Sequence, residues 1–229
     1  MTAETGGELP EPASEATHPV PATVSTAESD PIVVIGEQFI APKPVELKIQ
    51  HTVFTVAENY FDITDDIGNP IFKVRDRLFS FPNRRVLFDA NGSPLVCLRQ
   101  KILSVRRRWK VFRGESQKSS DFLFSVRRSS SILVRMKTRT ATATSLDVFL
   151  ASNTTETLPD FSIKENWRSS TCTFFHGNLI IAEMHRNHNV RSLVINADNY
   201  GITAYPNVDY AFIVALVIIL DEINRHGDA

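Results

Sequence analysis

The sequence predicts a mainly β domain in which a closed antiparallel barrel encloses a hydrophobic C-terminal helix. Three observations indicate this fold: short runs of alternating apolar and polar residues from Val45 onward, a repeated turn motif, and the apolar segment Val208–Leu220. Period-two alternation is typical of strands that face a core on one side and water on the other. The apolar segment supplies the core that such a barrel requires.

A repeated motif of the form D-x-x-G-x-P marks two of the turns. It begins at Asp65 and again at Asp89, an offset of 24 residues, and a weaker third copy lies at residues 174–179. Glycine supplies the positive φ of a tight hairpin turn, and the proline after it can open a strand without donating a ladder hydrogen bond. Each clear copy therefore predicts a strand, a tight turn and a second strand.

Further strands follow from the alternating runs between these hairpins and the C-terminus. We predict them at Trp109–Arg113, Asp121–Arg128, Ser131–Thr138, Leu146–Ala151, Asp160–Trp167, Ser170–Phe175, Leu179–His185, Ser192–Ala197 and Gly201–Tyr205. In the run that starts at Ser131, apolar residues alternate with mostly cationic ones, which predicts one apolar and one positively charged face. A meander of such hairpins can close into a barrel.

The apolar segment near the C-terminus is too short to span a membrane. Tyr210–Leu220 contains no charged residue and would be about 16 Å long as a helix, whereas a bilayer core is about 30 Å thick. We predict a helix with Asn207 as its N-cap, Asp209 at the positive end of its dipole, and an end near Arg225. Because a helix that is apolar on every face must be surrounded, we expect the strands to enclose it.

The 229 residues accommodate one sizeable domain and a tail. Residues 1–30 are acidic and rich in Pro, Ala, Thr and Ser, so we expect a disordered tail, followed by the barrel domain at 31–225 and a flexible C-terminus at 226–229. The apolar stretch Ile32–Ile35 is the first segment expected to pack on the domain. Cys97 and Cys172 lie in strand-like runs without metal-binding spacing, which predicts reduced, buried thiols.

The N-terminal sequence lacks the basic and apolar regions of a signal peptide, and neither end carries a lipidation motif. We therefore expect a cytoplasmic protein without a transmembrane segment, which can attach peripherally to the plasma membrane.

Charge is segregated along the chain although the net charge is only −1. Residues 1–70 hold two Lys or Arg against twelve Asp or Glu, whereas residues 71–140 hold eighteen against four. Residues 141–229 are acidic again, with five against ten. Local charge determines which polyanions a surface attracts, because fields are screened beyond about 8 Å at physiological salt.

Four segments resemble those of a known family: LFSFPNRRVLFDANGSPLVCL at 78–98, RRWKVFRG at 107–114, LFSVRRSS at 123–130 and PNVDYAFIVALVIILDEIN at 206–224. The sequence resembles plant LURP-one-related proteins, of the tubby-like C-terminal domain group, over about residues 32–224. The resemblance implies a tubby-like barrel of twelve antiparallel strands threaded by a central helix. It also implies a role in signalling or plant defence, and tubby proteins bind phosphoinositides through cations outside the barrel.

Cationic residues between 73 and 139 form the candidate binding surface, and their period-two spacing predicts that many point outward. They are Lys73, Arg75, Arg77, Arg99, Lys101, Arg106, Arg107, Arg108, Lys110, Arg127, Arg128, Arg135, Lys137 and Arg139. Such a surface attracts anionic phospholipid headgroups, with Arg giving bidentate contacts. The alternative is a solvated barrel exterior whose charges pair with the acidic segments.

Nucleic acid is a rival polyanion for this surface. Trp109 and Phe112 lie among the arginines and could stack on bases, but the alternation suits ordinary strand positions equally well, and the sequence carries no nucleic-acid-binding signature. Protein partners remain an open alternative.

The sequence favours a non-catalytic protein without a cofactor, because it contains no common hydrolase, metalloprotease or P-loop motif. Cys172, His176, His185 and His188 could be drawn as a metal site, but hairpin and surface positions explain them better. The run Arg127–Ser131 is a candidate site for basophilic kinases, and a phosphate added there would weaken any polyanion contact. Its alternative interpretation is a polar turn. We predict peripheral binding of anionic phospholipid headgroups, with a regulatory protein that binds nucleic acid or protein as the alternative.

Overall fold

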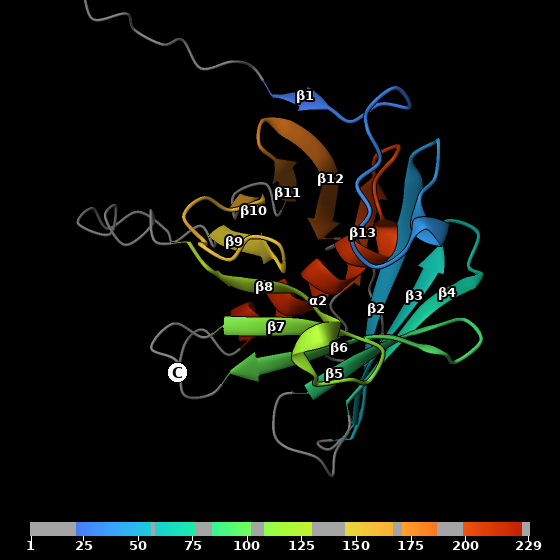
Figure 1. Cartoon of the computed structure of the whole chain (residues 1–229). Coiled ribbons are helices and arrows are strands. Elements are labelled where there is room, and N and C mark those ends of the chain that lie inside the picture. Colours follow the sequence, from blue (N-terminus) through green and yellow to red (C-terminus); the bar gives the residue numbers. More distant parts are fainter. Residues whose placement is uncertain are drawn as a thin grey trace, which may run out of the picture.

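The computed structural model describes residues 22–55, 58–76, 84–101, 108–129, 145–166, 171–186 and 199–225. Within them, twelve consecutive strands form an antiparallel sheet that closes on itself around one long helix, α2 (Figure 1). Each strand from β2 to β11 pairs with the next one along the chain, and β13 closes the ring between β12 and β2. The predicted closed barrel with a central C-terminal helix is confirmed.

The barrel strands are β2 (Val45–Thr55), β3 (Glu58–Asp65), β4 (Pro70–Asp76), β5 (Arg84–Asp89), β6 (Pro94–Lys101), β7 (Arg108–Arg113), β8 (Phe122–Arg128), β9 (Ser145–Leu150), β10 (Phe161–Asn166), β11 (Thr171–His176), β12 (Leu179–Arg186) and β13 (Asn199–Ala204). Two short 3-10 helices are η1 (Glu37–Phe39) and η2 (Ser119–Asp121). The predicted strands from Trp109 onward match β7 to β13 within two residues at each end, except that those at Ser131–Thr138 and Ser192–Ala197 lie outside the described residues.

The repeated motif forms two tight hairpin turns, β3–β4 and β5–β6. In each copy the backbone N–H of the aspartate, Asp65 or Asp89, donates to the carbonyl four residues later, at 3.0 Å. Gly68 and Gly92 have φ angles of 97° and 85°, a conformation that glycine adopts without steric cost. The weaker third copy is also a turn, between β11 and β12, where Gly177 has a φ of 59°.

The helix α2 (Tyr210–Arg225) fills the barrel. Every residue from Ala211 to Leu220 is at most 2% exposed, and the ring of Phe212 lies 5.1 Å from that of Phe124 and 5.0 Å from that of Phe161. The apolar segment is therefore buried in protein, as predicted. In the part of the chain that the structure describes, no helix has the length and hydropathy needed to cross a membrane.

The helix is capped by Asp209, so the prediction of Asn207 as N-cap is wrong. Asp209 Oδ1 accepts the N–H of Phe212 at 3.0 Å. Asn207 instead lies in a tight turn before the helix with a φ of 60°, which asparagine tolerates better than most residues. Its side-chain amide donates to the carbonyls of Ala27 and Ser29, both at 2.8 Å. Asn207 thus fixes the segment that precedes the barrel.

That segment, residues 22–44, is called the N-terminal strap here. Its strand β1 (Thr23–Val24) pairs in parallel with the start of β12, where β13 does not reach (Figure 1). Ser25 is 2% exposed and its hydroxyl donates to the carbonyl of Pro206 at 2.8 Å. Ile32 and Ile35 are buried, as predicted for this stretch. Contacts with the barrel therefore begin before residue 31, where the sequence suggests that the domain starts.

Polar contacts surround the C-terminal end of α2. Arg85 points into the barrel and its Nη2 lies 2.6 Å from Glu222 Oε1, with both side chains less than a tenth exposed. The hydroxyl of Tyr200 donates to Asp221 Oδ1 at 2.8 Å. Buried charges of this kind are tolerated because they are paired and hydrogen-bonded.

Candidate functional site

Cations and core residues alternate along the strands that face the predicted binding surface. On β7, Trp109 is 2% exposed and belongs to the core, while its neighbours Arg108 and Lys110 point outward. On β4, Lys73 and Arg75 are exposed and alternate with buried residues in the same way. The period-two interpretation of the basic segment is confirmed at these positions.

The strand register places like charges side by side on the outside of the barrel. Arg84 on β5 is directly opposite Arg99 on β6, which is itself opposite Lys110 on β7. In the neighbouring row, Lys101 is opposite Arg108. Directly opposed like charges are destabilising unless something compensates them. This part of the barrel therefore concentrates positive potential and requires counter-groups.

The loop between β7 and β8 supplies two such groups. The Nη2 atom of Arg84 donates to the backbone carbonyl of Glu115 at 3.0 Å and lies 3.9 Å from its carboxylate. Nη1 of Arg99 donates to the side-chain oxygen of Gln117 at 2.7 Å. Arg84 was not among the predicted site residues, although it is directly opposite the predicted Arg99.

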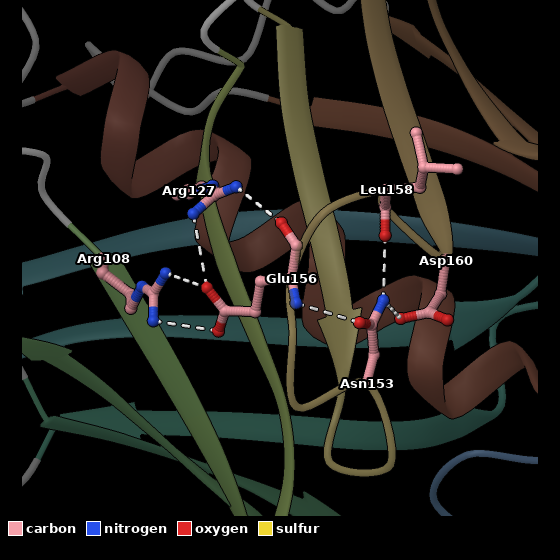
Figure 2. Close-up of polar contacts among 6 residues, drawn as sticks. All are labelled: Arg108, Arg127, Asn153, Glu156, Leu158 and Asp160. Carbon is pink, nitrogen blue, oxygen red and sulfur yellow. Dashed lines mark hydrogen bonds and ion pairs between the residues drawn. The ribbon is translucent and has the colours of Figure 1, made fainter.

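The loop between β9 and β10 supplies the third group, the carboxylate of Glu156 (Figure 2). Arg108 binds it through both guanidinium Nη atoms, with Nη1 at 3.0 Å from Oε1 and Nη2 in contact with Oε2. Arg127 on β8 reaches the same carboxylate, with Nη1 at 3.3 Å from Oε2, and also the backbone carbonyl of Glu156. One carboxylate thus connects two arginines of adjacent strands, a contact that the sequence analysis did not predict.

Four predicted cations form no ion pair with a carboxylate among the described residues. In the part of the chain that the structure describes, Lys73, Arg75, Lys101 and Lys110 contact no hydrogen-bond acceptor. Arg75 lies over the ring of Phe88 at 5.9 Å, and Lys110 lies over that of Phe122 at 5.3 Å. Such cation–π contacts orient a cation without neutralising it.

The remaining predicted cations divide into two groups. Arg128 points to the other face of β8 from Arg127, since its Nη2 donates to the carbonyl of Ile223 near the end of α2 at 3.3 Å. It is therefore not part of the outward surface that the sequence predicts. Six others lie outside the described residues: Arg77, Arg106, Arg107, Arg135, Lys137 and Arg139.

We define the basic surface as the outward cations of β4 to β8. They are Lys73, Arg75, Arg84, Arg99, Lys101, Arg108, Lys110 and Arg127.

The aromatic residues among these cations are not available for stacking on bases. Trp109 is inside the barrel, and Phe112 is 8% exposed, with its ring 5.6 Å from that of Phe122. The residues that could be drawn as a metal site are only partly described. Among the described residues, no group of three Cys, His, Asp or Glu side chains could hold a metal ion, and His188 lies outside them.

The two cysteines, Cys97 and Cys172, are free and buried, as predicted. Burial raises the pKa of the Cys172 thiol above its usual range, and the nearby carboxylate of Glu165 adds to the effect.

The suggested kinase site is only partly described. Ser129 is 8% exposed, its N–H donates to the carbonyl of Ser145 at 2.8 Å, and its side chain hydrogen-bonds Asp147. A kinase cannot reach a hydroxyl in this position without opening the strand pair. Ser130 and Ser131 lie outside the described residues.

Comparison with known proteins identifies the family. The family model described as LURP-one-related matches residues 45–221, which run from the start of β2 into α2. The chain belongs to the LURP-one-related family. Its relatives in Arabidopsis thaliana include LURP-one-related 15, 42% identical over 86% of this chain and 88% of that protein, and LURP1, 37% identical over 86% and 92%. Both family members match nearly the whole domain.

A solved structure supports the same fold for the family. An X-ray structure of an Arabidopsis thaliana protein superposes with a TM-score of 0.63 and is 36% identical, and the match covers 84% of this chain and 98% of that one. The barrel and helix described above are therefore the LURP-one-related fold.

Proposed function

We propose that this LURP-one-related chain is a non-catalytic protein that binds anionic phospholipid headgroups, phosphoinositides in particular, through the basic surface. It would attach peripherally to the cytoplasmic side of a membrane in a signalling role, of which plant defence is the example that the family resemblance implies. Nucleic acid or a protein partner is the alternative ligand of the same surface.

One observation carries the proposal: the adjacent cations Arg84, Arg99 and Lys110 lie in one row, with Lys101 in the next. Glu115 compensates Arg84, but Gln117 is neutral, so the opposed charges of Arg99 and Lys110 keep a cost in the folded state that an anionic ligand would lower. Arginine in such a row can bind a phosphate bidentately, and lysine contributes a point charge.

The magnitudes favour a membrane surface over a single weak ion pair. Each Lys or Arg close to an anionic membrane contributes about 1 kcal/mol, so three of them together contribute roughly a hundredfold in affinity. A lone exposed salt bridge with a soluble partner contributes about 0–1 kcal/mol. Several cations on one side of the barrel are therefore effective mainly against a surface that carries many anions.

The test is vesicle flotation of the full chain. Phosphatidylcholine vesicles with and without a phosphoinositide are compared at low and high salt. The triple variant K73E/R75E/K101E is expected to lose roughly a hundredfold in affinity, because it removes three cations for which no acceptor is described. Its matched control is K43E/K48E/K164E, which makes the same charge change at exposed lysines outside the basic surface.

Two results would contradict the proposal. The first is equal binding to neutral and anionic vesicles, and the second is equal loss of binding in the two triple variants. Thermal unfolding of each variant separates lost binding from lost structure.

A gel shift on random duplex DNA and single-stranded RNA tests the alternative. The buried positions of Trp109 and Phe112 remove the stacking platform that single-strand binding would use. A gel shift that K73E/R75E/K101E abolishes, together with no vesicle binding, would favour nucleic acid over lipid.

A further inference from the structure

Glu156 occupies the strongest anion-binding position that the described basic surface offers. Arg108 holds its carboxylate through two parallel N–H···O contacts, and Arg127 adds a third (Figure 2). A planar guanidinium binds a phosphate with the same bidentate geometry as it binds a carboxylate. The side chains of Arg108, Arg127 and Glu156 are 25%, 21% and 25% exposed, so solvent reaches all three groups.

Arg127 is held in place independently of Glu156. Its guanidinium lies over the ring of Phe149 with 4.3 Å between Cζ and the ring centroid, and Phe149 is 1% exposed. Asp147 is directly opposite Arg127 in the strand register. The arginine therefore keeps its orientation when the carboxylate of Glu156 leaves, which is a property of a preorganised binding site.

Glu156 itself lies on an exposed loop in a strained backbone conformation. Its φ is 49°, a left-handed conformation that is strained for glutamate. Asn153 fixes this turn, because Asn153 Oδ1 accepts the N–H of Glu156 at 3.1 Å while its Nδ2 donates to the carbonyl of Leu158 and to the carboxylate of Asp160 (Figure 2). The residues on either side of Glu156 are exposed, so little apolar packing holds the loop in place.

We propose that Arg108 and Arg127 form a receptor for a phosphate monoester, and that Glu156 occupies this receptor as a competing carboxylate until a phosphate displaces it. The inference rests on the proposed function, because it takes the basic surface as anion-binding, and it adds the position of the strongest contact and its regulation.

The balance of charges explains why Glu156 would keep other weak anions out of the receptor. Arg108 and Arg127 are balanced by Glu156 and by Asp147, which is 9% exposed and cannot move away. Displacement of Glu156 leaves a net charge of +1 on Arg108, Arg127 and Asp147, and Lys101, which is opposite Arg108, raises the local charge to +2. A phosphate monoester carries about −1.5 to −2 charges at pH 7 and so compensates the site better than one carboxylate does. A weakly charged anion gains too little to displace Glu156.

The experiment uses the full chain and two variants of the competing residue. E156Q removes the charge and keeps the size of the side chain, and E156G removes both the carboxylate and the strained backbone. Two probes distinguish the source of the phosphate: phosphatidylcholine vesicles with phosphatidylinositol 4-phosphate, and soluble inositol bisphosphate measured by calorimetry. E37Q is the matched control, because Glu37 is exposed on η1 and loses the same charge.

Both E156Q and E156G are expected to bind at least one probe about fivefold or more tightly than the wild type, since a competing ion pair has been removed. E37Q is expected to stay within about twofold, as a distant exposed charge is screened. The gain in affinity is expected to vanish in R127Q/E156Q, because this variant lacks one of the two receptor arginines. A gain for both probes assigns the receptor to phosphate monoesters in general, and a gain for vesicles alone assigns it to a lipid headgroup.

Failure of this inference differs from failure of the proposed function. If the wild type binds vesicles through the basic surface but E156Q and E156G match E37Q, the receptor inference is wrong and the proposed function stands. A gain in affinity that persists in R127Q/E156Q would also show that the receptor inference is wrong while the proposed function stands. If the wild type and both Glu156 variants ignore both probes, the two proposals fall together.

Discussion

The carboxylate of Asp209 accepts the backbone N–H of Ile35 at 2.6 Å and so joins the N-terminal strap to the residue that caps the barrel helix. Its Oδ2 also accepts the N–H groups of Val34 and Gly36, both at 3.1 Å. Arg113 of β7 completes the connection, because its Nη1 donates to the carbonyl of Ile35 at 2.9 Å. The Asp209 carboxylate thus holds the strap against the start of α2, and Arg113 holds the strap against the barrel wall.

Substitution of Asp209 by Ala is expected to lower the free energy of unfolding by about 3 kcal/mol or more. Loss of an N-cap costs about 1 kcal/mol, and each hydrogen bond to a charged acceptor contributes about 1.5–3 kcal/mol. Chemical denaturation measures the change. The control is D89A, in an exposed hairpin turn, where the carboxylate accepts the N–H of Ser93. Equal losses in the two variants would show that the strap contact adds nothing to stability.

The buried pair of Arg85 and Glu222 predicts a non-additive result. R85M alone is expected to cost about 3–5 kcal/mol, because it leaves a buried carboxylate without its counter-charge. R85M/E222L is expected to recover most of that loss, since replacing both charges by apolar side chains removes the desolvation cost. Denaturant unfolding of the single and double variants gives the coupling energy. A double variant less stable than R85M would refute the prediction.

Phe212 tests whether α2 is the core of the domain. F212A is expected to cost about 3–5 kcal/mol, because it removes the ring that contacts both Phe124 and Phe161 and leaves a cavity. The comparison is L158A, at a side chain that is 76% exposed, with an expected effect within about 0.5 kcal/mol. Thermal and chemical unfolding report both values. A small effect of F212A would mean that the barrel is stable without its central packing.

Asp147 predicts a dependence of stability on pH. Burial raises the pKa of this carboxyl above its unfolded value, against the opposing effects of the Ser129 hydrogen bond and the Arg127 charge. Between those two pKa values the folded state binds more protons than the unfolded state, so this group destabilises the fold as pH rises through its folded pKa. D147N, which cannot ionise, is expected to gain stability relative to the wild type from pH 3 to pH 7. A constant difference across that range would contradict the assignment.

The barrel and its helix could be predicted because their signals are local. Alternation along β7 separates Trp109 from Arg108 and Lys110, and the length of the apolar run alone rules out a membrane span. The N-cap could not be predicted correctly, because its choice depends on the strap, whose contacts with Asn207 and Asp209 join positions more than 170 residues apart. Local capping preference treats the two side chains as nearly equivalent.

The residues that contact the basic surface could not be predicted from the sequence either. Glu156 is 48 residues from Arg108 and 29 from Arg127, and only the order of β7, β8, β9 and β10 in the barrel brings them together. Period-two alternation identified outward cations but could not show which of them an acid already occupies. The prediction for Arg128 failed for a related reason, since a long cationic side chain at a barrel end can turn inward as readily as outward.

Closure of the ring by β13 has a consequence for synthesis of the chain. β13 (Asn199–Ala204) must pair with β2 (Val45–Thr55), and α2 follows it, so neither the last seam nor the core exists until residues 199–225 have been synthesised. A nascent chain held on the ribosome presents the apolar faces of its earlier strands to water, and such intermediates are slow to fold and prone to aggregation. Chaperone occupancy during translation is therefore expected to persist until β13 and α2 have emerged from the exit tunnel.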